Sequence, residues 1–197
     1  MTDDLDAKEP QPRRRAGETA LLAAVPEAEP LVGALRRRYD AAAGAGIPAH
    51  VTVLYPFLDV SRIDAGVIGA LTGLFGRQEP FEVEFARCGR FPDVLFLAPE
   101  PAAPFVALTE AVAARWPEAP PYAGKFDDPH PHLTVAYDRT PVSFEPGTYD
   151  AVEAELRPGL PVSARVASVS LFVCDENERW HQRQVFSLGG GTGTPGS

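Results

Sequence analysis

Hydrophobic and polar residues alternate in several short stretches of the chain, and between these stretches the apolar positions recur at helical spacing. Alternation with a period of two predicts half-buried strands, whereas apolar residues at i, i+3 and i+4 predict amphipathic helices. Because strands and helices are mixed along the chain, the order favours an α+β protein with antiparallel or mixed sheets rather than a doubly wound parallel one. The predicted strands are 19–25, 50–55, 81–85, 94–97, 132–137, 162–174 and 184–188, and the predicted helices are 29–43, 63–75, 104–116 and 145–156.

The distribution of Pro, Gly and charge predicts one folded unit with a tail at each end. Residues 1–17 are polar and rich in Pro and charge, and residues 189–197 contain mostly Gly, Thr, Pro and Ser, so both segments are expected to be disordered. The stretch 18–188 is long enough for one compact domain, or two lobes that share a core, but too short for two independent domains. A loop dense in Pro, Gly and Asp, residues 117–131, leads directly into His132.

A hexapeptide that occurs twice is the strongest signal in the sequence. HVTVLY at 50–55 and HLTVAY at 132–137 share His, Thr, Val and Tyr at the same four positions, and about half of the folded chain separates them. Each lies in a predicted strand. The layout therefore indicates a half-domain written twice, and a pseudo-twofold axis between the halves would bring the two motifs to one groove.

The alternation within each motif sorts its side chains onto two faces. Side chains two residues apart in a strand point to the same side, so His50 and Thr52 share one face while the residues between them point into a lobe. His132 and Thr134 repeat this division. An imidazole has a pKa of about 6.5, so near neutral pH one ring can accept a proton from water while the other donates one to a leaving oxygen. Hydroxyl groups can donate to the non-bridging oxygens of a phosphodiester, so this set suits metal-free attack on phosphorus.

With HxT twice, first inside HVTVLYPF and then inside PHLTVAY, the chain resembles the 2H phosphoesterase superfamily, which includes bacterial 2′-5′ RNA ligases and cyclic phosphodiesterases. The resemblance spans nearly the whole folded chain. It implies a bilobal, duplicated α+β fold in which two small sheets line a central cleft and the helices lie outside. It also implies a cofactor-free hydrolysis of a 2′,3′-cyclic phosphate, or of a related cyclic or 2′-5′-linked nucleotide. In that reaction His132 would act as base and His50 as acid, and Thr52 and Thr134 would bind the phosphate.

Residues beside the second motif are weaker candidates. Lys125 and Arg139 could contact phosphate, although solvated surface charges look the same in a sequence, and His130 could lie at the rim of the site. His130 and His132 could also bind a metal ion together, but Pro131 separates them and no third ligand is evident, so we expect no metal site.

The overall charge limits the substrates. A net charge of −9 opposes tight non-specific binding to long nucleic acid, so a small nucleotide or a cyclic phosphate at an RNA end is the expected partner. No apolar run is long enough to span a membrane, and the first ten residues are acidic where a secretory signal would be basic. We therefore expect a cytoplasmic protein, a monomer, with Cys88 and Cys174 as reduced thiols.

Two alternatives to hydrolysis remain open. The same acid and base could join RNA ends through a 2′-5′ bond, which requires binding two RNA ends. The groove could also belong to a non-catalytic RNA- or nucleotide-binding module of the same fold.

Overall fold

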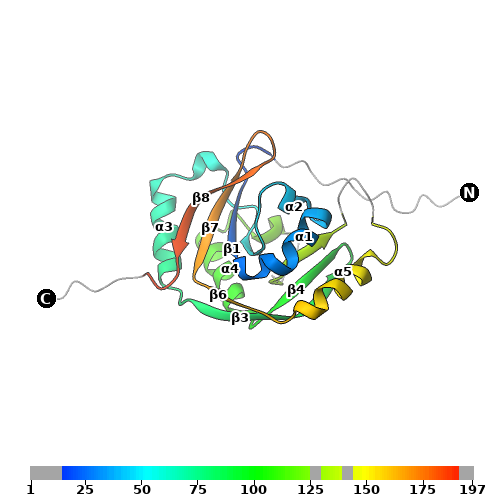
Figure 1. Ribbon diagram of the computed structural model, residues 1–197. Helices are drawn as coiled ribbons and strands as arrows, with labels where there is room; N and C mark the ends of the chain where they lie inside the picture. The colour runs from blue at the N-terminus through cyan, green and yellow to red at the C-terminus, as the bar shows by residue number, and fades with distance from the viewer. Residues whose placement is uncertain (1–14, 125–129, 139–143, 191–197) are drawn as a thin grey trace, which may run out of the picture.

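Two four-stranded sheets make up the body of the protein in the computed structural model, which describes residues 15–124, 130–138 and 144–190 (Figure 1). In the first sheet the strand order is β2-β1-β7-β8, and in the second sheet it is β5-β4-β3-β6. Every neighbouring pair is antiparallel, which confirms the expected α+β class. The first sheet contains β1 (Thr19–Ala24), β2 (His50–Leu54), β7 (Ser168–Cys174) and β8 (Trp180–Ser187), and the second contains β3 (Phe81–Phe91), β4 (Val94–Glu100), β5 (Leu133–Tyr137) and β6 (Val162–Val166).

Two helices pack in a reciprocal way across the sheets. α1 connects β1 to β2 but contacts β5 of the second sheet, and α4 connects β4 to β5 but contacts β2 of the first sheet. The strands β2 and β5 each form one edge of their sheet and contact each other. The unit β1-α1-β2 thus corresponds to the unit β4-α4-β5, as the repeated hexapeptide predicts. The helices are α1 (Glu29–Tyr39), α2 (Ala41–Gly44), α3 (Ala65–Gly76), α4 (Ala103–Arg115) and α5 (Thr148–Leu156), with short 3-10 turns at Pro26–Ala28, Val60–Arg62, Pro121–Gly124 and Arg157–Gly159.

The single helix predicted for 29–43 is wrong, because the helix breaks at Asp40. The backbone of Asp40 is extended, with φ −133° and ψ 109°, and its side chain accepts a hydrogen bond from the amide of Ala42. Asp40 therefore ends α1 and serves as the N-cap of α2. Its side chain also pairs with Arg36, so the break is tied to the site described below.

The single strand predicted for 162–174 is also wrong, because these residues belong to two sheets. β6 pairs with β3 of the second sheet, whereas β7 pairs with β1 and β8 of the first sheet. The change of sheet occurs at Ala167, whose carbonyl accepts a hydrogen bond from the amide of Leu188. The chain thus crosses between the sheets within one residue.

Other boundaries move by a few residues. β3 continues to Phe91 instead of ending at 85, and β8 begins at Trp180 instead of 184. α5 starts at Thr148 because Gly147, with φ 85°, precedes it in a left-handed conformation. The tails expected at 1–17 and 189–197 lie mostly outside the described residues, although the amide of Gly17 bonds to the carbonyl of Cys174.

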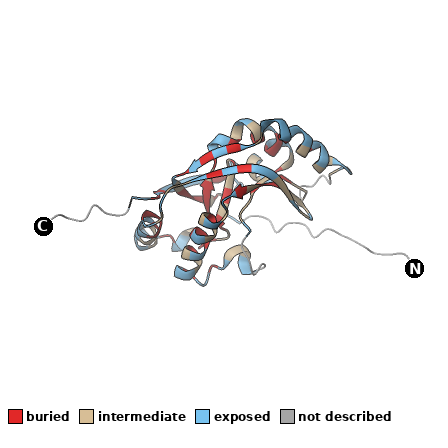
Figure 2. Ribbon diagram, turned by 90° about the horizontal axis from the view of Figure 1, so that it is seen from below, coloured by how far each residue is buried: buried red, intermediate tan, exposed pale blue. Residues whose placement is uncertain are grey.

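The main hydrophobic core is continuous between the two sheets. It includes Leu21 and Val51 from the first sheet, Leu95 and Leu133 from the second, and Phe75 from α3. Figure 2 shows buried residues along the strands and on the inner sides of the helices, with exposed residues facing outward. A smaller cluster covers the opposite face of the first sheet and contains Ala20, Leu22, Ile47, Phe172, Cys174 and Trp180. Within the described ranges, no helix is long and apolar enough to cross a bilayer.

Candidate active site

The first motif lies on β2 with its polar side chains on one face. His50 and Thr52 are half-buried, while Val51 and Val53 are fully buried in the main core. This is the division that strict alternation predicts. β2 is the edge strand of the first sheet, and it contacts β5 of the second sheet.

The second motif repeats this arrangement on the edge strand of the other sheet. His132 directly precedes β5 and is half-buried, as is Thr134, whereas Leu133 and Val135 are fully buried. Because β2 and β5 are in contact, the fold brings the two predicted pairs to the same region.

Both histidine rings are held by the same hydrogen bond. Nδ1 of His50 lies 2.8 Å from the carbonyl oxygen of Pro48, and Nδ1 of His132 lies 2.7 Å from that of His130. A carbonyl oxygen can only accept, so in each neutral ring the proton is on Nδ1 and Nε2 carries a lone pair. Neither Nε2 atom has a hydrogen-bond partner among the described residues. Each ring can therefore accept a proton at Nε2, or donate one there once it is protonated.

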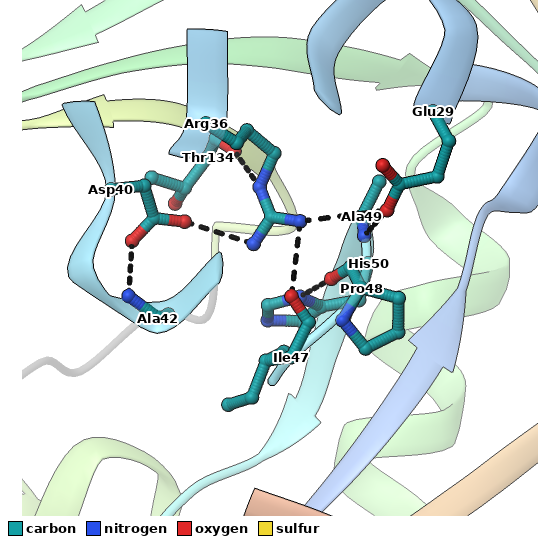
Figure 3. A network of polar contacts seen from close by, with 9 residues as sticks. All are labelled: Glu29, Arg36, Asp40, Ala42, Ile47, Pro48, Ala49, His50 and Thr134. Carbon is teal, nitrogen blue, oxygen red and sulfur yellow. Dashed lines mark hydrogen bonds and ion pairs between the residues drawn. The ribbon is translucent and has the colours of Figure 1, made fainter. Parts of the chain in front are cut away.

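A buried arginine joins the two half-sites (Figure 3). Arg36, on α1, donates from Nε to the carbonyl of Thr134 at 3.1 Å and from Nη1 to the carbonyl of Ile47 at 3.3 Å. Its Nη2 pairs with Asp40 Oδ2 at 2.9 Å. Glu29 lies 3.8 Å from Nη1 and accepts a hydrogen bond from the amide of Ala49, next to His50. The charge of Arg36 is thus paired, while its other N–H groups bond to the second motif and to the segment that precedes the first motif.

The surroundings of His50 strongly oppose its protonation. Burial, followed by the positive charge of Arg36, lowers the pKa of His50 to about 3, against the raising effect of the hydrogen bond to Pro48. The His132 ring lowers the pKa of His50 by a smaller amount. In the free protein His50 is therefore neutral near pH 7.

An aromatic wall surrounds His132. Its ring lies 5.2 Å from the ring of Phe91 and 5.3 Å from that of Phe96, measured between centroids, and His130 packs against the same two phenylalanines. Phe96 lies directly over Gly89, where a Cβ would overlap the phenyl ring. Burial among these groups lowers the pKa of His132, the hydrogen bond to the carbonyl of His130 opposes this, and the His130 ring lowers it slightly further.

The two threonine hydroxyls are free to bind a ligand. Thr52 and Thr134 are half-buried, and neither hydroxyl bonds to any residue that the structure describes. Two hydroxyl donors on the same strand faces as two imidazoles suit the oxygens of a tetrahedral phosphate.

Of the three weaker candidates for phosphate contacts, the structure describes one. His130 is exposed and lies beside His132, as expected for a rim residue, whereas Lys125 and Arg139 fall outside the described residues. Arg90, on β3, is bound to Asp150 and Glu153 of α5 at 2.7 and 2.6 Å. Because side chains alternate along a strand, the guanidinium of Arg90 lies on the opposite face of the sheet from Gly89 and Phe91.

Other sites are not indicated in the described part of the chain. No group of three or more His, Cys, Asp and Glu side chains there is arranged to hold a metal ion. Two surface hollows, one beside Asp59 and Asp175 and the other beside Arg90 and Tyr149, contain neither histidine of the motifs. The paired motifs remain the place where reactive side chains converge.

Sequence reasoning missed three residues of this region, namely Arg36, Phe91 and Phe96. A signal for Arg36 exists in the spacing, because Val32, Arg36 and Asp40 follow one another at four-residue intervals and so lie on one face of a helix. An arginine four residues before an aspartate on the face of a buried valine predicts an inward ion pair. No comparable signal marks the two phenylalanines, whose position depends on how β3 and β4 pair.

Comparisons with known proteins give a family from the sequence and a fold from solved structures. A sequence model of the 2′-5′ RNA ligase superfamily matches residues 24–178. The crystal structure of E. coli LigT complexed with NADP+ aligns with a TM-score of 0.56 and 20% identity, covering 89% of this chain and 99% of LigT. The LigT complex with 3′-AMP gives a TM-score of 0.56 at 19% identity, with 88% and 99% covered. TT0787 of Thermus thermophilus gives 0.54 at 20% identity, with 88% and 98% covered. No curated protein sequence gives a significant match.

Proposed function

Because the chain belongs to the 2′-5′ RNA ligase superfamily, we propose that it is a metal-independent phosphodiesterase that hydrolyses a 2′,3′-cyclic phosphate or a related cyclic or 2′-5′-linked nucleotide. The observation that carries the proposal is the repeated hydrogen bond from Nδ1 to a carbonyl, at His50 and at His132. It makes Nε2 of each ring available for proton transfer, and each ring shares a strand face with the hydroxyl of Thr52 or Thr134.

The reaction needs one neutral and one protonated ring. The neutral imidazole takes a proton from water as its oxygen bonds to phosphorus, and the protonated imidazole gives its proton to the ribose oxygen as the P–O bond breaks. The roles implied by the family resemblance, His132 as base and His50 as acid, require His50 to be protonated in the complex. Since its pKa is about 3 in the free protein, that proton has to be taken up with the substrate, whose negative phosphate favours a charged ring.

Substrate size and charge support a nucleotide rather than long RNA. The chain carries a net charge of −9, which weakens attraction to extended phosphate backbones. Solved structures of LigT contain 3′-AMP and NADP+, both nucleotides. A single phosphate can be bound by the two hydroxyls and one imidazolium without a basic surface.

We expect kcat/KM to fall as the pH rises through neutrality. This parameter reports ionisations of the free enzyme, and the productive form has one proton on the two rings. That form predominates between the pKa of His50, about 3, and the pKa of His132, which burial lowers from its ordinary value; its proton is on His132 and has to pass to His50 in the complex for His50 to act as the acid. The optimum should therefore lie below pH 6.5, with about a tenfold loss per pH unit on the alkaline side. Initial rates between pH 4 and 9 provide the measurement, and a kcat/KM that increases from pH 6 to pH 8 would contradict a protonated imidazole as the acid.

The direct test is hydrolysis of the four 2′,3′-cyclic nucleotides and of ADP-ribose 1″,2″-cyclic phosphate by the purified protein in EDTA. We expect turnover of at least one of them, with 31P NMR identifying which ribose oxygen keeps the phosphate. Activity that disappears on chelation and returns with zinc would overturn the metal-independent reaction. Tight nucleotide binding with no turnover of any substrate would instead favour the binding-module alternative.

Ligation through the same acid and base is the second candidate, favoured by the superfamily that matches residues 24–178. It opens the same ring with a different nucleophile: the 5′-hydroxyl of one RNA, instead of water, attacks the 2′,3′-cyclic phosphate of another, a 2′-5′ bond forms and the 3′ oxygen leaves with the proton of the acid. Incubation with cleaved tRNA halves, followed by denaturing electrophoresis, separates the two: a joined product supports ligation, and opening of the cyclic end alone supports hydrolysis.

A further inference from the structure

Arg36 lies buried between the two half-sites, with 1% of its surface exposed. Through Nε it bonds to the carbonyl of Thr134 in β5, and through Nη1 to the carbonyl of Ile47, three residues before His50 (Figure 3). One side chain is therefore bonded to both histidine-bearing segments. Resting on the proposed phosphodiester reaction, we propose that Arg36 is a positioning residue that ties β5 to the segment before β2 and fixes the separation of the two imidazoles.

Two carboxylates fix the orientation of the guanidinium. Asp40 binds Nη2 and is itself 5% exposed, and its other oxygen caps α2 through the amide of Ala42. Glu29 faces Nη1 and holds the amide of Ala49. The planar fork of arginine allows bonds in these different directions at once, which the single ammonium of a lysine does not reproduce. The network therefore specifies arginine rather than a positive charge in general.

The other half of the molecule has a corresponding contact, but an uncharged side chain makes it. Thr109 of α4 donates from Oγ1 to the carbonyl of Val53 in β2 at 2.8 Å, just as Arg36 of α1 donates to the carbonyl of Thr134 in β5. Both helices thus bond to the edge strand of the opposite sheet. Only the Arg36 side adds a cation, so the two half-sites are alike in geometry and unlike in electrostatics.

The charged groups around this contact act mainly on His50. Arg36, with Glu29 and Asp40 as its counter-charges, faces His50 from α1 and its end, and His132 faces it from the segment before β5. Arg36 opposes protonation of His50, whereas the groups that act on His132 are its own burial and His130. The pKa of His50 is therefore a measurable property that depends on the charge of Arg36.

The first test is Arg36→Lys, measured on the full chain with a 2′,3′-cyclic nucleotide. Lysine keeps the charge but loses the bonds to both carbonyls, so we expect kcat to fall about 10- to 100-fold with little change in KM, since a displacement of about 1 Å at reacting groups costs on this order. Thr109→Val is the comparison variant, because it removes the corresponding hydrogen bond to the carbonyl of Val53, which reaches only one of the two segments, so kcat should fall less than in Arg36→Lys. A folded Arg36→Lys variant with wild-type kcat would overturn the proposal.

The second test removes the charge. Arg36→Met alone would leave Asp40 buried without a partner and is expected to unfold, so the variant is Arg36→Met combined with Asp40→Asn. NMR titration of the histidine rings should show the pKa of His50 rising in this double variant, and remaining low in Arg36→Lys and Thr109→Val. An unchanged titration of His50 in the double variant would refute the electrostatic part of the proposal.

These readouts separate this proposal from the proposed function. If the wild-type protein hydrolyses no cyclic nucleotide, the function fails, while the ring titrations still report on Arg36. If the wild type is active and Arg36→Lys is equally active, the positioning role alone fails.

Discussion

Replacing either His50 or His132 with alanine is expected to lower kcat for a 2′,3′-cyclic nucleotide by about 10²–10⁴-fold, the usual contribution of one proton-transfer group. Each ring has Nδ1 bonded to a carbonyl and Nε2 free, so neither can replace the other without losing its half of the transfer. The double variant should be scarcely worse than either single variant, because the two rings act in one step. Steady-state kinetics of the three variants provide the measurement.

His181→Ala is the control for the histidine variants. This histidine is exposed on β8, at the opposite edge of the first sheet from β2, and pairs with Asp175 at 2.7 Å. Its removal should leave kcat within about twofold of the wild type, the small effect expected for a surface substitution. Wild-type turnover in either His50→Ala or His132→Ala would show that the reaction does not use the paired imidazoles.

Removing the hydroxyl of Thr52 or of Thr134 is expected to lower kcat/KM by about 10²-fold in each case, the size reported by removal of one oriented donor to a developing oxyanion. Valine keeps the branched shape of each side chain, so Thr52→Val and Thr134→Val remove the donor with little change in packing. Each hydroxyl is half-buried and has no partner among the described residues, so it is available to the phosphate. Initial rates over a range of substrate concentration separate losses in kcat from losses in KM.

Serine variants and an exposed threonine complete this experiment. Thr52→Ser and Thr134→Ser keep the hydroxyl and should retain most of the activity. Thr72→Val, on the exposed side of α3, removes a hydroxyl that bonds only to the carbonyl of Ile68 and should have no kinetic effect. Serine variants as inactive as the valine variants would show that the methyl group, and not the hydroxyl, is what the site needs.

The sequence predicts the motif strands well because their alternation is strict. In β2 and β5 the apolar residues point into a continuous core. The His and Thr residues that alternate with them point to the other face and are half-buried. One-sided burial makes the register of such strands unambiguous, since a slip by one residue would bury both histidines. The repeat then predicts that the two faces meet, and the contact between β2 and β5 agrees.

The features that the sequence does not predict depend on tertiary partners. The change of sheet at Ala167 has no Gly or Pro to mark it, and only a change in the phase of the alternation, between Val166 and Val169, coincides with it. Arg36 is marked only by its four-residue spacing from Val32 and Asp40, a weak signal because charged side chains are rarely buried unless they are paired. Its burial follows from Asp40, Glu29 and two carbonyls that come together only in the folded chain.

The exchange of α1 and α4 between the sheets means that neither β-α-β unit is complete by itself. In a lone unit the helix would lack the strand of the opposite sheet on which it packs. Two separate units could bury both helices only by associating as two subunits, each with its helix on the other. Linking them in one polypeptide makes that association intramolecular, so it no longer depends on how many molecules are present. The distance between the two imidazoles therefore does not depend on the protein concentration.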